Sequence, residues 1–210
     1  MNKDSDVGTK RKFMEKALML FAEKGYEAVS VAQIASAVGC SAPALYKHYK
    51  SKQELFDAIM AESEKGFKTQ MEKFHVDFTS HPEEKQRYLS ISEEEEIEII
   101  QNVTRSTIED EFVSAFRKML LVEQFHYPEL AEMYNYRYIT YQYEQHAELF
   151  KMFMEEGKMK KADPMVLARM YMSVPIVAIG ICDREPERID ECMEMIKQHI
   201  KEFNRCYKTL

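Results

Sequence analysis

Three neighbouring side chains near the start of the sequence, Tyr46, Lys47 and His48, combine an aromatic ring with two hydrogen-bond donors, and Lys52 follows shortly after. Lysine and histidine can donate to phosphate oxygens and to base edges, whereas a tyrosine can contact a phosphate or a thymine methyl group. This combination is typical of a surface that binds DNA. Small residues that leave little for direct base reading precede the run: Ala42, Pro43 and Ala44.

Other kinds of chemistry find less support in the sequence. No nucleophile with a base and no pair of carboxylates stands at a spacing that would serve catalysis. The cysteines, at 40, 182, 192 and 206, form no CxxC pair and have no histidine at ligand spacing, so we expect free thiols in a reducing cytoplasm, with a redox-sensing role left open. Four adjacent glutamates at 93–96 would point around a helix and not converge on a metal ion. We therefore expect no enzyme, no metal and no cofactor.

Two short helices and a tight turn would position the basic run. Ser30 can cap a helix that starts at Val31, and Gln33 stands at the offset of a capping box. Gly39 would end that helix in a left-handed conformation. Ser41 can then cap a second helix over about 42–48, with proline in its first turn, and Leu45 would be its inward anchor. A helix, a glycine turn and a second helix with an outward polar face fit a helix–turn–helix, although an unrelated αα-hairpin has the same outline.

The same stretch resembles the DNA-binding domain of the TetR family of bacterial transcriptional regulators. The resemblance extends back to a helix over 9–24 and its Gly25-Tyr26 end, and it covers roughly a quarter of the chain. The matching residues are Ile34-Ala35, Gly39, Leu45-Tyr46, His48-Tyr49 and Lys52. Several separately spaced positions must coincide for such a match, which makes a chance agreement improbable.

The resemblance implies an all-α protein of about nine helices. An N-terminal three-helix domain over 1–52 would bind DNA, and a long fourth helix, capped by Ser51 with Glu54, would lead into a ligand-binding and dimerisation domain over 53–210. The implied partners are double-stranded operator DNA, a second copy of the chain and a small-molecule effector. The residues that the resemblance assigns to DNA are Ala42, Pro43, Ala44, Tyr46, Lys47, His48 and Lys52, with Ser30, Val31 and Ala32 near the DNA backbone.

The sequence predicts further helices in the rest of the chain. Segments 112–124 and 133–153 have helical apolar spacing, 79–92 is a loop or a short helix, and 93 onward is an acidic helix start capped by Ser92. The apolar run 170–182 has thirteen residues, too few to span a bilayer, so we expect a buried helix and no membrane partner.

Segment 134–143 contains five tyrosines and one arginine. On a regular helix Tyr134, Tyr138 and Tyr141 share one face, whereas Tyr136 and Tyr143 lie on another. Buried aromatic residues usually serve packing, but phenols also line cavities that bind small molecules. The ligand-binding candidates are Tyr134, Arg137, Tyr138, Tyr141 and Met170.

The last two helices leave more apolar surface than a single chain covers comfortably, which indicates a partner subunit. In the resembled family the two C-terminal helices of each subunit form the dimer interface. The corresponding candidates here are Met170, Val174, Ile189, Met193, Ile196, Ile200 and Phe203.

The charge is distributed unevenly. The formal net charge is −7, yet residues 1–60 carry nine Lys/Arg against seven Asp/Glu. A slightly basic N-terminal end on an acidic body has the right sign for a DNA-reading end. The family resemblance implies a ligand-responsive repressor that binds a pseudo-palindromic operator as a dimer. Two alternatives remain open at this point: an architectural DNA-binding factor of the same fold without an effector, and an enzyme housed in a helical bundle.

Overall fold

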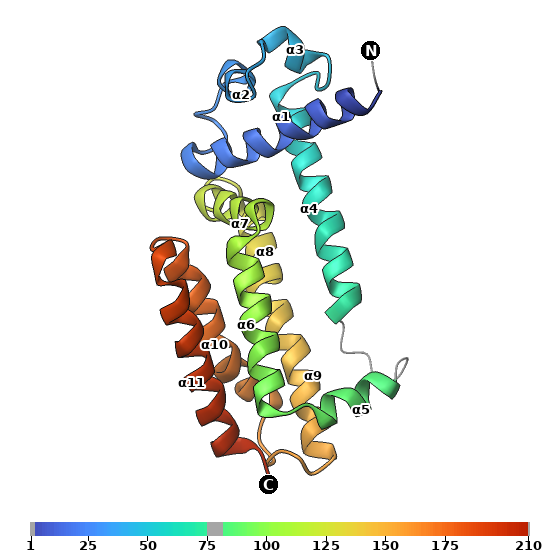
Figure 1. Ribbon diagram of the computed structural model, residues 1–210, viewed down its shortest axis with the longest axis vertical. Coiled ribbons are helices and arrows are strands. Elements are labelled where there is room, and N and C mark those ends of the chain that lie inside the picture. Colours follow the sequence, from blue (N-terminus) through green and yellow to red (C-terminus); the bar gives the residue numbers. More distant parts are fainter. Residues whose placement is uncertain (1–2, 75–81, 210) are drawn as a thin grey trace. The chain divides into compact units, whose positions relative to one another are not determined.

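The computed structural model describes residues 3–74 and 82–209, and it confirms an all-α fold (Figure 1). The described residues contain no strand, only an isolated bridge between Met159 and Lys208. The helices are α1 (Lys3–Lys24), α2 (Val31–Ala37), α3 (Ala42–Tyr46), α4 (Lys52–Phe74), α5 (Pro82–Ser90), α6 (Glu93–Glu109), α7 (Glu111–Glu123), α8 (Pro128–Asn135), α9 (Tyr141–Glu155), α10 (Pro164–Cys182) and α11 (Ile189–Tyr207). A π-helical stretch, Tyr136–Thr140, joins α8 to α9, and a 3₁₀ turn, Pro186–Arg188, precedes α11.

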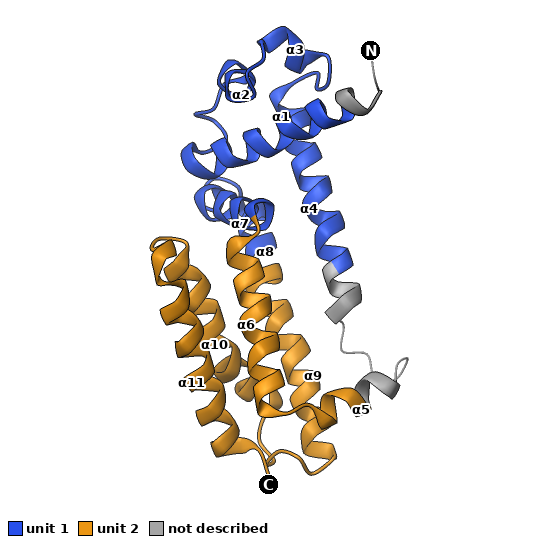
Figure 2. Cartoon of the chain, in the orientation of Figure 1, with its two compact units in different colours: residues 1–73, 111–134 blue, residues 74–110, 135–210 orange. Residues whose placement is uncertain are grey.

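Two compact units make up the chain (Figure 2). Unit 1 comprises residues 1–73 and 111–134, and unit 2 comprises residues 74–110 and 135–210. This division differs from the one expected at residue 52, because α4, α7 and α8 pack with the N-terminal helices. Each unit therefore combines segments that are distant in the sequence.

α1 begins at Lys3, earlier than the expected start at residue 9. The added residues are polar or small and include Val7, which is 69% exposed, so no apolar stripe marks this first part of the helix. Farther along α1, Phe13, Ala17, Leu18 and Phe21 are buried and form part of the core of unit 1. Hydrophobic periodicity detects a helix only where the helix packs against something.

The expected helix over 133–153 is a continuous helical run from Pro128 to Glu155 that contains one π-helical stretch. The backbone N–H of Tyr141 donates to the carbonyl of Tyr136, the i to i+5 bond of a π-helix. This wider turn brings the rings of Tyr136 and Tyr141 to 6.2 Å between centroids. The prediction that these two tyrosines lie on different faces was therefore wrong, because it assumed 3.6 residues per turn throughout.

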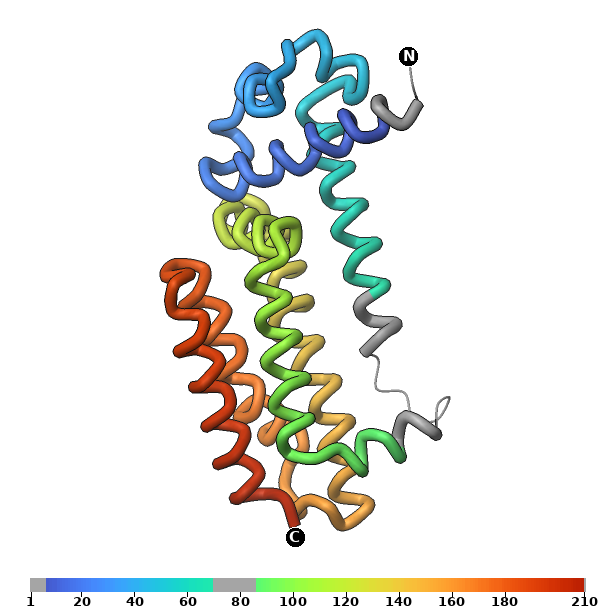
Figure 3. Tube along the Cα trace, in the orientation of Figure 1, coloured from blue at the N-terminus to red at the C-terminus, as the bar shows by residue number. Residues whose placement is uncertain are grey.

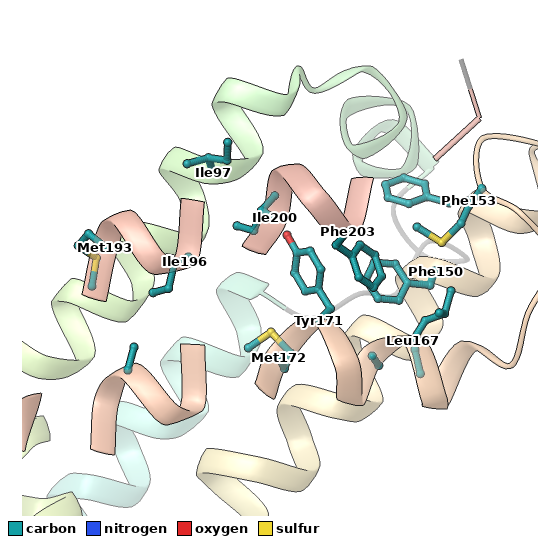
Figure 4. Close-up of a cluster of buried hydrophobic side chains, with 14 of the residues drawn as sticks. Ile97, Phe150, Phe153, Leu167, Tyr171, Met172, Met193, Ile196, Ile200 and Phe203 are labelled. Carbon is teal, nitrogen blue, oxygen red and sulfur yellow. The ribbon is translucent and has the colours of Figure 1, made fainter. Parts of the chain in front are cut away.

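Unit 2 is built around an apolar cluster to which α6, α9, α10 and α11 all contribute. α10 and α11 lie side by side in the trace (Figure 3). The rings of Phe150, Tyr171 and Phe203 gather in the cluster, with centroids 4.9 to 5.5 Å apart (Figure 4). The aromatic cluster ties α9, α10 and α11 together.

α10 has 19 residues, so the expectation that its apolar run is too short to cross a membrane was wrong. The helix starts at Pro164, before the apolar run 170–182, as Asp163 and Pro164 predict from the sequence. The Asp163 carboxylate caps it by accepting the N–H groups of Met165 and Val166. By length and composition alone it is the one helix in the described ranges that could span a bilayer. Its buried residues, among them Leu167, Ala168 and Tyr171, belong to the core cluster of unit 2, and a core helix has the same composition.

Candidate nucleic-acid interface

α2 starts with the predicted capping box. The Ser30 hydroxyl accepts the N–H of Gln33 at 3.2 Å, and the Gln33 side chain accepts the N–H of Ser30 at 2.7 Å. The two bonds satisfy backbone donors that the first helical turn leaves open. Ile34 and Ala35 face inward and are buried, so the exposed start of α2 is held against the three-helix core.

The turn between α2 and α3 depends on Gly39. Its φ of +74° lies in the left-handed region, and a Cβ placed there would meet no atom within 4 Å. Glycine is therefore needed for the backbone conformation and not for space. The turn closes with the Cys40 N–H donating to the carbonyl of Ala35 at 2.9 Å, which satisfies an open carbonyl at the end of α2.

α3 is shorter than expected, with five residues over Ala42–Tyr46. Ser41 occupies the N-cap position, but its hydroxyl makes no capping bond; its carbonyl instead accepts the N–H of Ala44 at 2.9 Å. Leu45 is fully buried, as predicted, and fixes which way the helix faces. The next two residues continue as a turn, in which the His48 N–H donates to the Leu45 carbonyl at 2.9 Å.

The predicted DNA-binding residues lie along the start of α2, along α3 and in the turn after α3, except Lys52, which begins α4. Tyr46 is 52% exposed, which is unusual for a large ring and leaves it available for a partner. Ser30, Ala32, Pro43 and Lys47 are also exposed, while Val31, Ala42, Ala44 and His48 are half-buried. The His48 ring packs 5.7 Å from the ring of Phe13, so α1 supports it from behind.

Lys52 occupies a different environment from Lys47. It is half-buried at the start of α4, and its ammonium donates to the carbonyls of Tyr26 at 2.8 Å and Val29 at 3.1 Å. The same ammonium lies 4.1 Å from the centroid of the Tyr26 ring. Sequence reasoning found Lys52 but gave no sign of these three contacts.

Sequence reasoning missed Glu123 altogether. This carboxylate, at the end of α7, is 4% exposed and accepts the backbone N–H of Tyr26 at 2.5 Å. Burial, and then the charge of Glu27, raises the pKa of Tyr26. The signal available in the sequence was a glutamate at the end of a helix, following the apolar positions Phe116, Met119 and Leu120 at helical spacing.

The start of α4 shows a modified capping box. Glu54 donates its N–H to the Ser51 hydroxyl at 3.0 Å, as expected, but its carboxylate accepts from the N–H of Lys50 at 2.5 Å instead of from Ser51. Tyr49 is buried, its hydroxyl donates to the carbonyl of Lys10 at 3.2 Å, and burial raises its pKa. These contacts close the three-helix domain behind its exposed face.

The ligand-binding candidates divide between the two units. Tyr134 is half-buried in unit 1, whereas Arg137, Tyr138 and Tyr141 belong to unit 2, where Arg137 and Tyr141 are each 5% exposed. Met170 lies on the outer side of α10, 42% exposed, with its sulfur 4.0 Å from the Tyr207 hydroxyl. Within unit 2, Arg137 and Tyr138 belong to the π-helical stretch, and Tyr141 follows it at the start of α9.

The dimer-interface candidates also separate into two groups. Met170 is exposed, and Val174 and Ile189 are half-buried. The other four side chains pack into the core of their own chain and are at most 5% exposed: Met193, Ile196, Ile200 and Phe203. The sequence pattern identified apolar positions on α11 without showing that α6, α9 and α10 already cover them.

Comparison with known proteins agrees with this geometry. Residues 13–59 match the model of "Bacterial regulatory proteins, tetR family". The chain is 43% identical over 47 residues to the HTH-type transcriptional repressor ComR of Escherichia coli (strain K12), 22% of each chain. It is 30% identical over 115 residues to the HTH-type transcriptional regulator AcrR of Shigella flexneri, 55% of this chain and 46% of AcrR. These matches span less than half the length of either relative.

Solved structures extend the similarity of fold to nearly the whole chain. SmeT, the repressor of the Stenotrophomonas maltophilia multidrug efflux pump SmeDEF, superposes with a TM-score of 0.59 at 18% identity, covering 95% of this chain and 90% of SmeT. A TetR transcription regulator from Haloarcula marismortui gives 0.62 at 14% identity, covering 97% and 100%. With the helix–turn–helix and the matched family model, the N-terminal domain of this chain belongs to the TetR family of bacterial regulatory proteins, and the chain as a whole shares the fold of TetR-family regulators.

Proposed function

We propose that this protein is a ligand-responsive transcriptional regulator that binds operator DNA as a dimer and acts as a repressor. The observation that carries the proposal is the exposed face of the helix–turn–helix. Leu45 anchors α3 in the core, so that Tyr46 and Lys47 point into solvent beside the exposed start of α2. A short helix held from behind, with an aromatic ring and a basic group outward, suits the DNA major groove.

The residues of this face take separate roles. Lys47 and His48 donate to bases or phosphates, and Tyr46 contacts a phosphate or a thymine methyl group. Ala42, Pro43 and Ala44 allow close approach without adding polar groups, so shape and DNA deformability contribute to specificity. Ser30, Val31 and Ala32 lie near the DNA backbone, where the N-terminus of α2 favours a phosphate.

The second subunit binds along the exposed side of α10. Val166, Met170 and Val177 are 47%, 42% and 55% exposed, and they stand at helical spacing on one side, with Val174 half-buried beside them. Such an apolar face is typical of a surface that a partner covers. Twofold symmetry then presents two α3 helices to major grooves about 34 Å apart, which requires a pseudo-palindromic operator.

The effector is a small, largely apolar or aromatic molecule whose binding lowers DNA affinity in the cytoplasm. Tyr138, Tyr141 and Arg137 supply aromatic surface and a charged group, and the π-helical stretch sets their directions. Tyrosine faces also accept cations, so a lipophilic cation is one chemotype to include. Reciprocal linkage requires that DNA weaken effector binding by the same factor by which the effector weakens DNA binding. The coupling free energy between two such sites is typically about 1–3 kcal/mol.

Selection of bound sequences from random DNA tests the first part of the proposal. An enriched inverted repeat is expected, and Lys47→Ala should weaken binding to it, whereas Lys24→Ala, at an exposed lysine at the end of α1, should not. Recovery of no enriched sequence at low salt would contradict the proposal. Many dispersed sites without a shared sequence would favour an architectural factor instead.

A thermal-shift screen of hydrophobic and cationic compounds tests the effector. Each hit is then added to a measurement of operator affinity, with Tyr141→Ala as the matched variant. Hits that stabilise the wild type, lose their effect in Tyr141→Ala and lower operator affinity support the proposal. Hits that stabilise the protein but leave operator affinity unchanged would show a pocket without a switch.

A further inference from the structure

Lys52 is already engaged by the protein itself. A lysine ammonium has three donors, and here two of them go to the carbonyls of Tyr26 and Val29 while the charge also faces the Tyr26 ring. A phosphate at this position would have to replace bonds of 2.8 and 3.1 Å that hold a half-buried side chain. The location of Lys52 is therefore better suited to holding the backbone than to holding DNA.

Glu123 holds the same short segment from α7. Its almost fully buried carboxylate accepts the Tyr26 N–H, a charge-assisted bond in a place with little water. The Tyr26 hydroxyl in turn donates to the Gln53 side chain at 3.0 Å, and its ring lies 5.0 Å from that of Phe56. Tyr26 is thus fixed through its carbonyl, its N–H, its hydroxyl and its ring.

The segment that these contacts hold leads directly into the DNA-facing surface. The Val29 N–H donates to the Tyr26 carbonyl at 3.3 Å, which closes a turn over residues 26–29. The next residue is Ser30, the cap that starts α2. Any shift of the Val29 carbonyl therefore moves Ser30 and the first turn of α2, and with them the support of α3.

We propose that Lys52 and Glu123 are positioning residues for DNA binding, which fix the 26–29 turn from α4 and from α7 and so set the start of α2. Lys52 acts through this turn and not as a phosphate contact. The proposal rests on the proposed function, since it concerns how an operator-binding surface is held.

The test measures operator affinity against salt concentration for folded variants. Lys52→Met keeps the apolar stem and removes the charge, and we expect a loss of about tenfold, the size of one charge-assisted hydrogen bond. The slope of log affinity against log salt should equal that of the wild type, because no phosphate contact is lost. Lys24→Met is the matched control and should change neither quantity.

Glu123 gives a second, independent readout. Glu123→Met removes the acceptor of the Tyr26 N–H and should lower affinity with an unchanged salt slope, whereas Glu123→Gln keeps an oxygen acceptor and should retain most of the affinity. The double variant Lys52→Met/Glu123→Met should lose less than the product of the single losses, because both changes release the same turn.

Distinct outcomes overturn the inference. A slope shallower by about 0.9 for Lys52→Met would make Lys52 a phosphate contact. A lower melting temperature with unchanged affinity of the folded protein would leave Lys52 and Glu123 with a purely structural role. Failure of the wild type to bind any DNA would instead remove the proposed function and, with it, the need for positioning.

Discussion

The three-helix domain and the core of unit 2 use polar side chains in contrasting ways. In the domain, the side chains of Ser30, Glu54 and Lys52 bond to backbone groups. The partners of Ser30 and Glu54 lie within four residues of them in the sequence. In unit 2, Tyr171 donates to Glu96 across 75 residues at 2.8 Å, and Asn204 and Lys208 reach the same carboxylate at 2.7 Å across more than 100. The first arrangement shapes a surface, whereas the second joins α6, α10 and α11.

This contrast shows where each region obtains its stability. Local capping is worth little individually but fixes helix ends, so the DNA-facing surface depends on turn geometry. Unit 2 depends on a large apolar core and a polar network inside it, where unpaired groups are costly. The Asn204 side-chain oxygen is buried there and has no hydrogen-bond partner among the described residues, although the amide nitrogen donates to Glu93 and Glu96.

The largest effect is expected in the core of unit 2. Phe203→Ala removes a ring that is 5% exposed, stacks on Phe150 and meets Tyr171 edge-on, which should destabilise the protein by about 3–5 kcal/mol. Urea unfolding followed by circular dichroism measures the change. Lys201→Ala, at an exposed position of the same helix, is the control. A loss below about 1 kcal/mol would mean that the core of unit 2 does not dominate stability.

A smaller loss is expected in the polar network. Glu96→Gln keeps an acceptor for Tyr171 but removes the charge that Lys208 and Asn204 bind, and we expect about 1–2 kcal/mol. Glu98→Gln, an exposed neighbour on α6, should change little. Chemical denaturation measures the free energy of unfolding of both variants. Equal losses in the two would show that the polar network around Glu96 does not stabilise the protein.

Acidification should weaken unit 2 through His146. Burial lowers the pKa of this histidine, which packs against the rings of Phe150 and Tyr171, and its Nδ1 lies 2.8 Å from the Gln142 carbonyl. Below about pH 6.5 the unfolded chain binds a proton that the folded chain resists, so stability is present above that pH and falls as pH drops, by at most about 1.4 kcal/mol per unit.

Melting temperatures between pH 7.5 and 5.5 measure this dependence. His146→Gln should flatten the profile, whereas His126→Gln, at an exposed histidine, should leave its slope as in the wild type. An equally steep profile in His146→Gln would assign the acid sensitivity to other groups, such as Glu96, whose charge acts on His146.

The smallest expected loss of stability is at a helix cap. Ser30→Ala removes the acceptor for the Gln33 N–H and should cost about 1 kcal/mol, since the capping box of α2 is exposed. Its effect on operator affinity should exceed that of Ser36→Ala, an exposed serine on the same helix. A Ser30→Ala variant that binds the operator normally would separate capping from DNA binding.

The sequence allowed prediction of the local features and not of the long-range ones. The box of Ser30 and Gln33, the left-handed Gly39 and the anchor Leu45 were all predictable, because each depends on neighbours within four residues. The Ser92 cap and the acidic start of α6 are a further case, and the structure adds the capping-box bond of Glu95. Capping motifs and glycine turns have a fixed spacing, so a single sequence is enough to find them.

The missed features depend on contacts between residues that are far apart in the sequence, and a single sequence does not show which of these residues meet. Nothing near Lys52 indicates that Tyr26 and Val29 will present their carbonyls to it, and nothing near Glu123 indicates the Tyr26 N–H. Apolar periodicity predicted the apolar face of α11, but it could not show whether this face packs against other helices of the same chain or against a second subunit. The burial of Ile196 and Ile200 within one chain answers that question for those residues.

The turn at Gly25 limits how this protein can change by mutation. Gly25 has a φ of +84°, and a Cβ there would lie 3.0 Å from the Glu123 carboxylate oxygen. An asparagine in place of Gly25 tolerates the left-handed backbone but still brings a Cβ against Glu123. A shorter side chain in place of Glu123 makes room for that Cβ but loses the bond to the Tyr26 N–H, and the backbone at Gly25 stays left-handed. An evolutionary path away from this pair therefore passes through an intermediate that is less stable than either end, so we expect related sequences to keep or change the two positions together.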